Sequence, residues 1–384
     1  MPDVRGWKPR YADLVASRFA SRAAVALKLV SQPSAWAGRR SRSASPAGIL
    51  VLQQLLLGDT LLLTPLLSKL RRDHPRARIA MAVARPLLPL YASRPYGVEP
   101  LYYDARDPAS LAGLANGGGW DWTLLPADNR FAYLARALGS RWIIGFEGDV
   151  PAYKNWPVDE LRPFPAFPTT YADMAAGLVD GPPPEPYAVG QWPAPNLPPP
   201  SLPVDGDFAV LHVGASTPLK AWPVPRWRAL AEKLAALGYR IVWSGGPGEG
   251  ALVDAVDPDR RYPSLAGKVG LGELWHVLRR ASLLVCPDTG IAHLGRIVGV
   301  PTVTLFGPGA VEMYGAGEFW RDSAYRAVTF PDFPCRDQPM LFRRSLPWVR
   351  RCERDTTQCA GPRCMDAIDF DRVWDAVAEL LPTR

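Results

Sequence analysis

The chain has 384 residues, enough for two α/β domains, and 48% of them are apolar while 21% are charged. Residues 1–45 hold nine basic and two acidic side chains and so carry the whole net charge of +7. Because the remainder is balanced, a general nucleic-acid-binding surface is excluded.

The positive charge lies on an N-terminal extension, residues 1–46. Between positions 10 and 30, apolar side chains recur at helical spacing around Arg18, Arg22 and Lys28, which predicts a basic amphipathic helix. Such a helix can lie on an anionic membrane surface. The sequence equally allows a helix packed on the protein body or a partly disordered extension. The same basic residues interrupt the apolar run that a secretory signal needs.

The stretch from residue 47 to residue 67 is apolar enough to raise the question of a membrane span. Gly58, Asp59 and Pro65 lie within it, and a carboxylate near the bilayer centre costs about 3 kcal/mol or more. A buried strand, a Gly-Asp turn and a helix explain the stretch better. We therefore expect a cytoplasmic chain without a transmembrane helix, which could still bind peripherally at the inner membrane.

Strands alternate with helices along the first half of the chain. Residues 48–54 form a continuous apolar run, which predicts a buried strand of a parallel sheet. A helix is expected from Thr60 to His74, with Pro65 close to its first turn. Further strands are expected at Arg78–Ala84, Trp122–Pro126 and Trp142–Gly145. This alternation is typical of βαβ units and predicts a Rossmann-like domain over residues 47–181.

A Pro-rich linker at residues 182–206 leads to a second α/β domain at residues 207–330 and then to a Cys-containing tail with a C-terminal helix at residues 331–384. Strands are expected at Phe208–Val213, Arg240–Ser244, Leu283–Cys286 and Thr302–Phe306, and helices at Pro225–Leu237, Leu271–Arg280 and Ile291–Val298. Ligands bind beyond the carboxyl ends of parallel strands, so a cleft between the two domains is the expected site.

Polar clusters follow the predicted strands, where that rule places ligands. They are Gly58-Asp59-Thr60, GASTPLKAWP at 214–223, GGPGE at 245–249, and PDTGIAHLGRIVGVPTVTLFGP at 287–308. The backbone and hydroxyl groups of Gly214, Ser216 and Thr217 can face phosphate oxygens, and Lys220 adds a positive charge suited to a pyrophosphate. Asp59 at a strand end can act as a general base, or it can cap the helix expected from Thr60.

These clusters, in this order, resemble the ADP-heptose-using heptosyltransferases of lipopolysaccharide core synthesis, glycosyltransferase family 9. The shared features are Gly-Asp followed by Thr-Pro, the Gly-Ala-Ser loop ending in Lys-x-Trp-Pro, the Gly-Gly-Pro-x-Glu turn, and Asp-Thr-Gly-x-x-His before Phe-Gly-Pro. The resemblance is dense over residues 207–308 and moderate over 47–85. It implies an α/β fold of the GT-B type, with two Rossmann-like domains facing a central cleft, the acceptor on the first and the donor on the second.

The resemblance also implies a reaction, the inverting transfer of a heptose or related sugar from an ADP-sugar to a hydroxyl of a glycan or glycolipid. In that reaction Asp59 is the base, and Lys220 with Ser216 and Thr217 stabilises the leaving diphosphate. Asp288, Thr289 and Gly290 would hold the donor. Many members carry a basic residue shortly before the Gly-Asp pair, where this chain has Gln53-Gln54-Leu55, so an anionic acceptor contact expected there is in doubt.

Two further positions have a structural alternative beside their implied role. Glu249 resembles the residue that holds the nucleoside ribose, and could equally be a solvated acid in a turn. His293 could contact a phosphate, or be a half-buried histidine with satisfied hydrogen bonds.

The clusters contain no Asp-x-Asp that would hold a metal against a diphosphate, so we predict transfer that requires no metal or other cofactor. Cys335, Cys352, Cys359 and Cys364 are spaced C-x16-C-x6-C-x4-C and could hold structural zinc or iron, or remain free thiols. A related branch that glycosylates autotransporter proteins contains a cysteine-bound iron. Cys286 ends a predicted buried strand and is expected in the core.

Alternatives to a lipopolysaccharide acceptor remain open at this point. The acceptor could be a protein, as in the autotransporter-type heptosyltransferases. A sugar-nucleotide epimerase on the same scaffold would need no acceptor, and a non-catalytic scaffold would need no substrate. An NAD-dependent dehydrogenase is disfavoured, because no G-x-G-x-x-G follows a strand.

Overall fold

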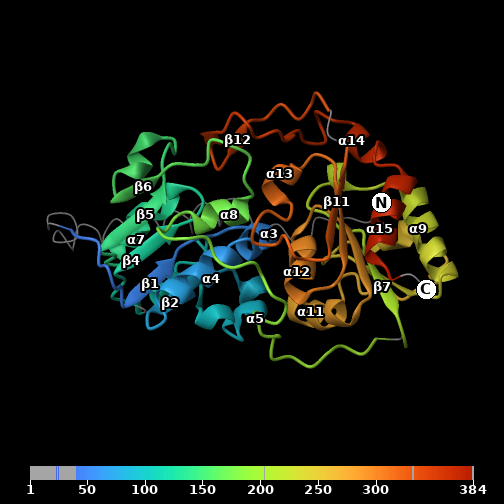
Figure 1. The fold of residues 1–384 in the computed structure, drawn as a ribbon, viewed down its shortest axis with the longest axis horizontal. Helices are drawn as coiled ribbons and strands as arrows, with labels where there is room; N and C mark the ends of the chain where they lie inside the picture. The colour runs from blue at the N-terminus through green and yellow to red at the C-terminus, as the bar shows by residue number, and fades with distance from the viewer. Residues whose placement is uncertain are drawn as a thin grey trace. The chain divides into compact units, whose positions relative to one another are not determined.

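The structure is a computed structural model that describes residues 40–116, 118–202, 204–330 and 333–382, together with Ala23 and Val25. It divides into two units, each built on a parallel β-sheet (Figure 1). Unit 1 comprises Met1–Gln54, Leu70–Phe164 and Phe342–Arg344, and unit 2 comprises Leu55–Lys69, Pro165–Leu341 and Ser345–Arg384. The amphipathic helix expected at residues 10–30 lies almost wholly outside the described residues.

Six parallel strands form the sheet of unit 1, in the order β3-β2-β1-β4-β5-β6. The strands are β1 (Gly48–Val51), β2 (Arg78–Val83), β3 (Glu99–Tyr102), β4 (Trp122–Leu125), β5 (Trp142–Phe146) and β6 (Glu160–Arg162). The central strand β1 is buried along its whole length, as its apolar sequence predicts. The short helical segments are η2 (Arg85–Leu87), α5 (Leu88–Tyr91), η3 (Pro95–Gly97), α6 (Ser110–Asn116), η4 (Asn129–Phe131), α7 (Ala132–Ala137) and η5 (Ala152–Asn155).

The helix expected from Thr60 to His74 is instead two helices, α3 (Leu57–Leu61) and α4 (Thr64–Asp73). Pro65 has no N–H to donate and lies in the first turn of α4, where that group has no acceptor within a helix. Asp59 lies inside the first turn of α3, whose N-cap residue is a leucine without a side-chain cap. The alternative that Asp59 is a helix N-cap is therefore wrong.

A buried lysine ties residues 55–69 to unit 2. The ammonium of Lys69 donates to the carbonyl oxygens of Ala176, Val179 and Gly181 at 3.1, 2.8 and 3.0 Å. These carbonyls lie at and just after the end of α8 (Tyr171–Ala176), so the segment that contains α3 is held within unit 2, although the next strand in sequence, β2, belongs to unit 1. The domain boundaries expected from the sequence stay a prediction.

Five parallel strands form the sheet of unit 2, in the order β11-β10-β9-β7-β8. The strands are β7 (Phe208–His212), β8 (Arg240–Ser244), β9 (Leu283–Pro287), β10 (Thr302–Phe306) and β11 (Tyr325–Thr329), and a separate hairpin pairs β12 (Met340–Leu341) with β13 (Arg344–Ser345). The helical segments are η6 (Pro218–Lys220), α9 (Val224–Ala236), α10 (Gly250–Val256), α11 (Leu271–Arg280), α12 (Gly290–Val298), α13 (Val311–Tyr314), α14 (Arg363–Asp366) and α15 (Phe370–Leu380).

Helices cover both faces of this second sheet. Alternate residues of β7, Ala209 and Leu211, join one core with Leu230 of α9 and Val373 of α15. α12 packs on β9 and β10, and α11 packs beside α12. Burial on both faces explains the continuous apolar strands, and the prediction of an α/β fold with two parallel sheets is confirmed.

The Pro-rich linker packs on unit 2 through aromatic side chains. The Tyr187 hydroxyl donates to the carbonyl of Ile297 at 2.8 Å, and its ring lies 4.6 Å from that of Trp320. Trp192 is buried with its ring 6.0 Å from that of Trp275 in α11. Tyr187 and Trp192 therefore anchor this part of the linker to unit 2.

Two basic residues of the N-terminal extension pair with carboxylates of unit 1. Arg40 contacts Asp159 at 2.9 Å and Arg42 contacts Glu160 at 3.4 Å, and Arg42 also covers the Trp122 ring. Within the described part of the chain, no helix is long and apolar enough to cross a membrane.

Candidate functional site

Two glycines let the helices α3 and α12 approach each other in unit 2. A Cβ atom on Gly290 would lie 2.4 Å from Cγ of Leu57 and 2.9 Å from the backbone nitrogen of Gly58. A Cβ atom on Gly58 would lie 3.0 Å from the imidazole of His293. The glycines of two predicted motifs therefore serve helix packing, which brings Asp59 to the helix end that follows Asp288.

Asp59 is half-buried beside groups of both charges. Burial, and then the negative charge of Asp288, raise the pKa of Asp59 to about 6, against the lowering effect of Lys220 and Arg351. A carboxylate with this pKa is ionised at neutral pH and takes up a proton more readily than an exposed aspartate. The structure thus brings together three residues that the sequence predicted, Asp59, Lys220 and Asp288.

Lys220 is held against Asp288. Its ammonium donates to the backbone carbonyl of Asp288 at 2.7 Å and to the Oδ2 atom at 2.8 Å. Asp288 directly follows β9 and is 6% exposed, and a Cβ atom on Gly309 would lie 2.3 Å from its Oδ2. Because this carboxylate is enclosed, Lys220 is held in place at the carboxyl end of β9.

The loop that leads to Lys220 is shaped by its own polar groups. Thr217 caps η6, with its hydroxyl accepting from the Leu219 N–H at 3.3 Å, while Ser216 is exposed. The next motif residue, Trp222, is buried and donates to the carbonyl of Ile368 at 2.7 Å. The tryptophan of Lys-x-Trp-Pro is thus a core residue that anchors the loop.

Glu249 joins two loops at the carboxyl ends of neighbouring strands. One oxygen accepts from the Ala215 N–H at 3.1 Å and the other accepts from the Gly246 N–H. A Cβ atom on Gly214 would overlap this carboxylate, at 1.8 Å from Oε2, so the glycine is required by the close approach. The alternative that Glu249 is a solvated acid in a turn is wrong, because its carboxylate accepts hydrogen bonds from the loops that follow β7 and β8.

His293 is a buried, neutral histidine. The guanidinium of Arg296 donates to its Nδ1, so the proton of the imidazole lies on Nε2. Burial, and then the charges of Arg296 and Lys220, lower the pKa of His293 well below its usual range. His293 can therefore donate one hydrogen bond from Nε2, on the side that faces Gly58, and cannot supply a positive charge.

Thr289 caps α12, and its hydroxyl accepts from the Ile291 N–H at 3.3 Å. Its role toward a donor sugar stays a prediction, as does that of Gly290. The N-terminal N–H groups of α12 lie at this end of the helix, where an anion is favoured.

Two residues of the site, Tyr314 and Arg351, were not found from the sequence. Tyr314 ends α13, and burial followed by the charge of Asp59 raises its pKa. Its hydroxyl shares a hydrogen bond with the guanidinium of Arg351. Neither residue lies in a recognisable motif, and Arg351 comes from the Cys-containing tail, so only the tertiary structure reveals them.

A comparison with known sequences identifies the family of the chain. The sequence profile of glycosyltransferase family 9 (heptosyltransferase) matches residues 125–337, which is more than half of the chain. The chain belongs to glycosyltransferase family 9. Three of the four motif clusters lie inside the matched range.

Individual members of the family are similar over different lengths. Lipopolysaccharide heptosyltransferase 3 of Escherichia coli is 24% identical over 310 residues, which cover 73% of this chain and 89% of that protein. Lipopolysaccharide heptosyltransferase 1 of Pseudomonas aeruginosa is 28% identical over 162 residues, which cover 36% of this chain and 45% of that one. The chain thus spans less than half the length of the Pseudomonas protein.

A solved structure is similar in fold. The ADP-heptose lipopolysaccharide heptosyltransferase II of Escherichia coli has a TM-score of 0.64 and 18% sequence identity, covering 87% of this chain and 98% of that chain. The resemblance seen in the motifs is therefore confirmed by the family match and by this fold.

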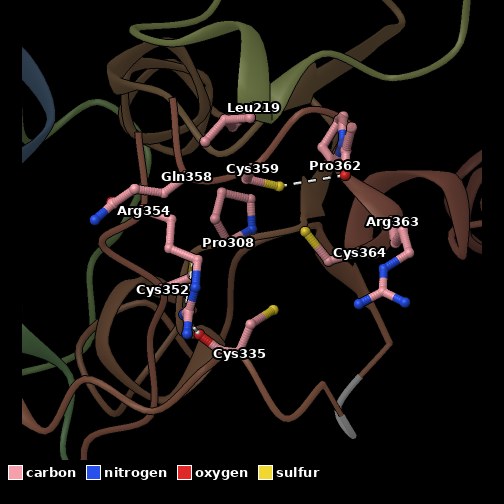
Figure 2. Close-up of a pocket in the computed structure, with 11 residues that line it drawn as sticks. Leu219, Pro308, Cys335, Cys352, Arg354, Gln358, Cys359, Pro362, Arg363 and Cys364 are labelled. Atoms are coloured by element: carbon pink, nitrogen blue, oxygen red, sulfur yellow. Dashed lines mark hydrogen bonds between the residues drawn. The ribbon is translucent and has the colours of Figure 1, made fainter. Parts of the chain in front are cut away.

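Four cysteines of this family 9 chain line one cavity of about 130 Å³. In Figure 2 the sulfur atoms of Cys335, Cys359 and Cys364 point toward the space between them, and Cys352 lies at its edge beside Arg354. All described cysteines are free thiols, and no three Cys, His, Asp or Glu side chains among the described residues are grouped to hold a metal ion. As placed, the thiols do not form a metal site. Cys286 is fully buried in the core, as predicted.

Proposed function

We propose that this family 9 chain transfers a heptose from ADP-heptose to a hydroxyl group of the lipopolysaccharide core, with inversion at the anomeric carbon. The observation that carries the proposal is the group formed by Asp59, Lys220 and Asp288 where α3 meets α12. It combines a carboxylate of raised pKa with a cation and helix N–H groups, which displacement of a diphosphate requires. The names of the heptosyltransferase relatives support the sugar and the acceptor class, and the solved heptosyltransferase II of Escherichia coli is named for ADP-heptose.

The reaction is a single displacement. The acceptor hydroxyl oxygen forms a bond to the anomeric carbon as the bond from that carbon to the diphosphate oxygen breaks. The electron pair of the broken bond leaves with ADP, and the hydroxyl proton passes to Asp59. Because Asp59 is ionised at neutral pH, it can accept this proton.

Positive and hydrogen-bonding groups would stabilise the negative charge that develops on the leaving diphosphate. Lys220 supplies the cation, and Ser216, Thr217 and the first N–H groups of α12 supply hydrogen bonds. Asp288 and Thr289 would orient the donor sugar, with His293 as a neutral donor from Nε2. Glu249 would act mainly by holding the Gly214 loop, beside any contact with the ribose.

These groups can do the electrostatic work for which other transferases use a divalent cation, so we propose transfer that is independent of metal. Activity that disappears on treatment with a chelator and returns with magnesium or manganese would contradict this. A cytoplasmic location with peripheral binding of residues 1–45 to an anionic membrane also stays a proposal, tested by sedimentation of the protein with vesicles of anionic or zwitterionic lipid.

Calorimetric titration with ADP, UDP, GDP and NAD tests the proposed donor. We expect ADP to bind in preference to the others, and the Lys220→Met variant to lose at least about tenfold in affinity. Lys268→Met, which removes an exposed lysine bonded to a backbone carbonyl, is the matched control. Preference for UDP or GDP would discard the donor, and the absence of any nucleotide binding would favour a scaffold.

Incubation with ADP-heptose tests the reaction class and the acceptor. Transfer to heptose-deficient lipopolysaccharide core, followed by the configuration of the new linkage, is the expected product. Conversion of the donor in the absence of an acceptor would favour an epimerase. Transfer to an autotransporter protein and not to the core glycolipid would favour the protein acceptor.

A further inference from the structure

The chain after β11 returns to the carboxyl ends of β9 and β10. The Arg336 guanidinium is buried and donates to the carbonyl oxygens of Phe306 and Gly307 at 3.1 and 3.0 Å. The Cys352 N–H donates to the carbonyl of Pro308 at 2.9 Å. Residues 336 and 352 are therefore both fixed to the segment that directly follows β10.

A short antiparallel bridge fixes the residue that precedes Cys352. The Gln338 N–H donates to the carbonyl of Arg351 at 3.0 Å. On the neighbouring strand, the Asp288 N–H donates to the carbonyl of Leu305 at 2.9 Å. Arg351 and Asp288 are thus held at the same edge of the sheet, at the ends of two adjacent strands.

The side chain of Arg351 turns toward the site and is 24% exposed. It shares a hydrogen bond with the Tyr314 hydroxyl and pairs with the carboxylate of Glu353. Its Nε atom is buried and has no hydrogen-bond partner among the described residues. A buried guanidinium N–H without an acceptor is costly, which points to a function for this position.

The charges around Asp59 come from several elements. Asp288 follows β9, Lys220 ends η6, and Tyr314 and Arg351 lie on α13 and the returning segment, while the neutral His293 belongs to α12. Lys220 already bonds to Asp288, and in the proposed reaction it would also meet the diphosphate. A bound diphosphate brings further negative charge, so a second cation is needed to keep Asp59 ionised.

We propose that Arg351 is a positioning residue that supplies this second cation, holding the Asp59 carboxylate ionised while Lys220 serves the leaving group. The inference rests on the proposed transferase function, in which Asp59 is the base. Arg351, after Lys220, also lowers the pKa of Asp59. Glu353 moderates the effect, because its exposed carboxylate pairs with the same guanidinium.

The test measures transfer as a function of pH for Arg351→Gln, with Arg351→Lys as the conservative variant. Arg350→Gln is the matched control, because Arg350 is exposed and its side chain bonds to the backbone carbonyls of Pro347 and Val349. We expect Arg351→Gln to raise the midpoint of the acidic limb by about one pH unit, which is a loss of about fivefold near pH 6 that nearly disappears at pH 8. Arg351→Lys should restore most of the limb, and ADP affinity should stay within about twofold in every variant.

Glu353→Gln provides a second test that leaves the arginine in place. Removing the competing carboxylate should move the acidic limb toward lower pH, opposite to the effect of Arg351→Gln. An acidic limb that stays unchanged in both variants, or a loss in Arg351→Gln that is equal at every pH, would overturn the inference. Failure of the wild-type protein to bind ADP or transfer heptose would instead overturn the proposed function, so the two failures are distinguishable.

Discussion

Replacement of Asp59 by asparagine should inactivate the enzyme and stabilise the fold. The structure raises the pKa of Asp59 from its ordinary value of 3.8 to about 6, because burial and Asp288 disfavour the ionised form. Ionised Asp59 therefore destabilises the folded state by about 3 kcal/mol at neutral pH. Asparagine avoids that penalty, although it also loses the favourable position of a negative charge in the first turn of α3, worth up to about 1 kcal/mol.

The stabilisation should depend on pH with a definite sign. Since the pKa is raised in the folded state, the unfolded chain releases its proton first, and the wild type loses stability relative to Asp59→Asn as the pH rises from about 4 through about 6. We expect a difference in the free energy of unfolding of about 1 kcal/mol at pH 4.5 and about 2–3 kcal/mol at pH 7.5. The transfer rate should fall by about 10²–10⁴ in the same variant.

Differential scanning calorimetry of both proteins at the two pH values measures this difference. In a unit of this size each kcal/mol corresponds to about 2–4 °C in Tm, so the shift at pH 7.5 should be several degrees. Asp259→Asn, which replaces an exposed aspartate of unit 2, serves as the control and should not reproduce this stabilisation. An Asp59→Asn protein that is no more stable than the wild type at pH 7.5 would refute the argument from burial.

Three further predictions concern helix packing, loop anchoring and thiol reactivity. Gly290→Ala should destabilise the protein by about 1–3 kcal/mol in chemical denaturation, because the new methyl group meets α3, whereas Gly250→Ala at the start of α10 meets open space and should be nearly neutral. Glu249→Gln should weaken ADP binding measured by calorimetry, because an oxygen that accepts a hydrogen bond from a loop N–H is replaced by a donor. Unchanged affinity would contradict the role of Glu249 in holding the two loops. Cys286 should react last with a thiol reagent followed by mass spectrometry, because burial raises its pKa to about 12, whereas the half-exposed Cys359 should react early.

The metal content of the purified protein tests whether the thiols that line the cysteine cavity bind a metal ion. Protein purified without added metal should contain zinc and iron far below one ion per chain if the thiols stay free. A stoichiometry near one would require Cys335, Cys352, Cys359 and Cys364 to close around an ion from their present positions.

Much of the fold follows from local sequence, for a physical reason. Strands such as β1 and β9 are buried on both faces and carry uninterrupted apolar runs, so they are visible without any knowledge of their neighbours. β3 and β6 were not predicted, because each is a short strand at a sheet edge, and β3 contains Pro100. The break between α3 and α4 was missed although Pro65 marks it.

The site divides in the same way. Motif order identified Asp59, Lys220 and Asp288. Lys220 and Asp288 follow β7 and β9, whose carboxyl ends share one edge of the unit 2 sheet, whereas Asp59 follows β1 of the other sheet and was identified by its motif alone. The sequence alone did not distinguish between a general base and a helix cap for Asp59, or between a ribose contact and a turn for Glu249. Those choices depend on which backbone N–H groups lie within hydrogen-bond distance, and that is a property of the packed loops.

Only the tertiary structure brings Arg351 and Tyr314 to Asp59. Arg351 is nearly three hundred positions from Asp59 in sequence and lies in no recognisable motif. Its placement depends on backbone hydrogen bonds to the segment at the end of β10. The protonation states likewise follow from the assembled site, since burial and neighbouring charges set the pKa of Asp59 and hold His293 neutral. Local sequence therefore determined the strands and the chemical groups at their ends, while long-range packing decided which charges meet and what each group can do.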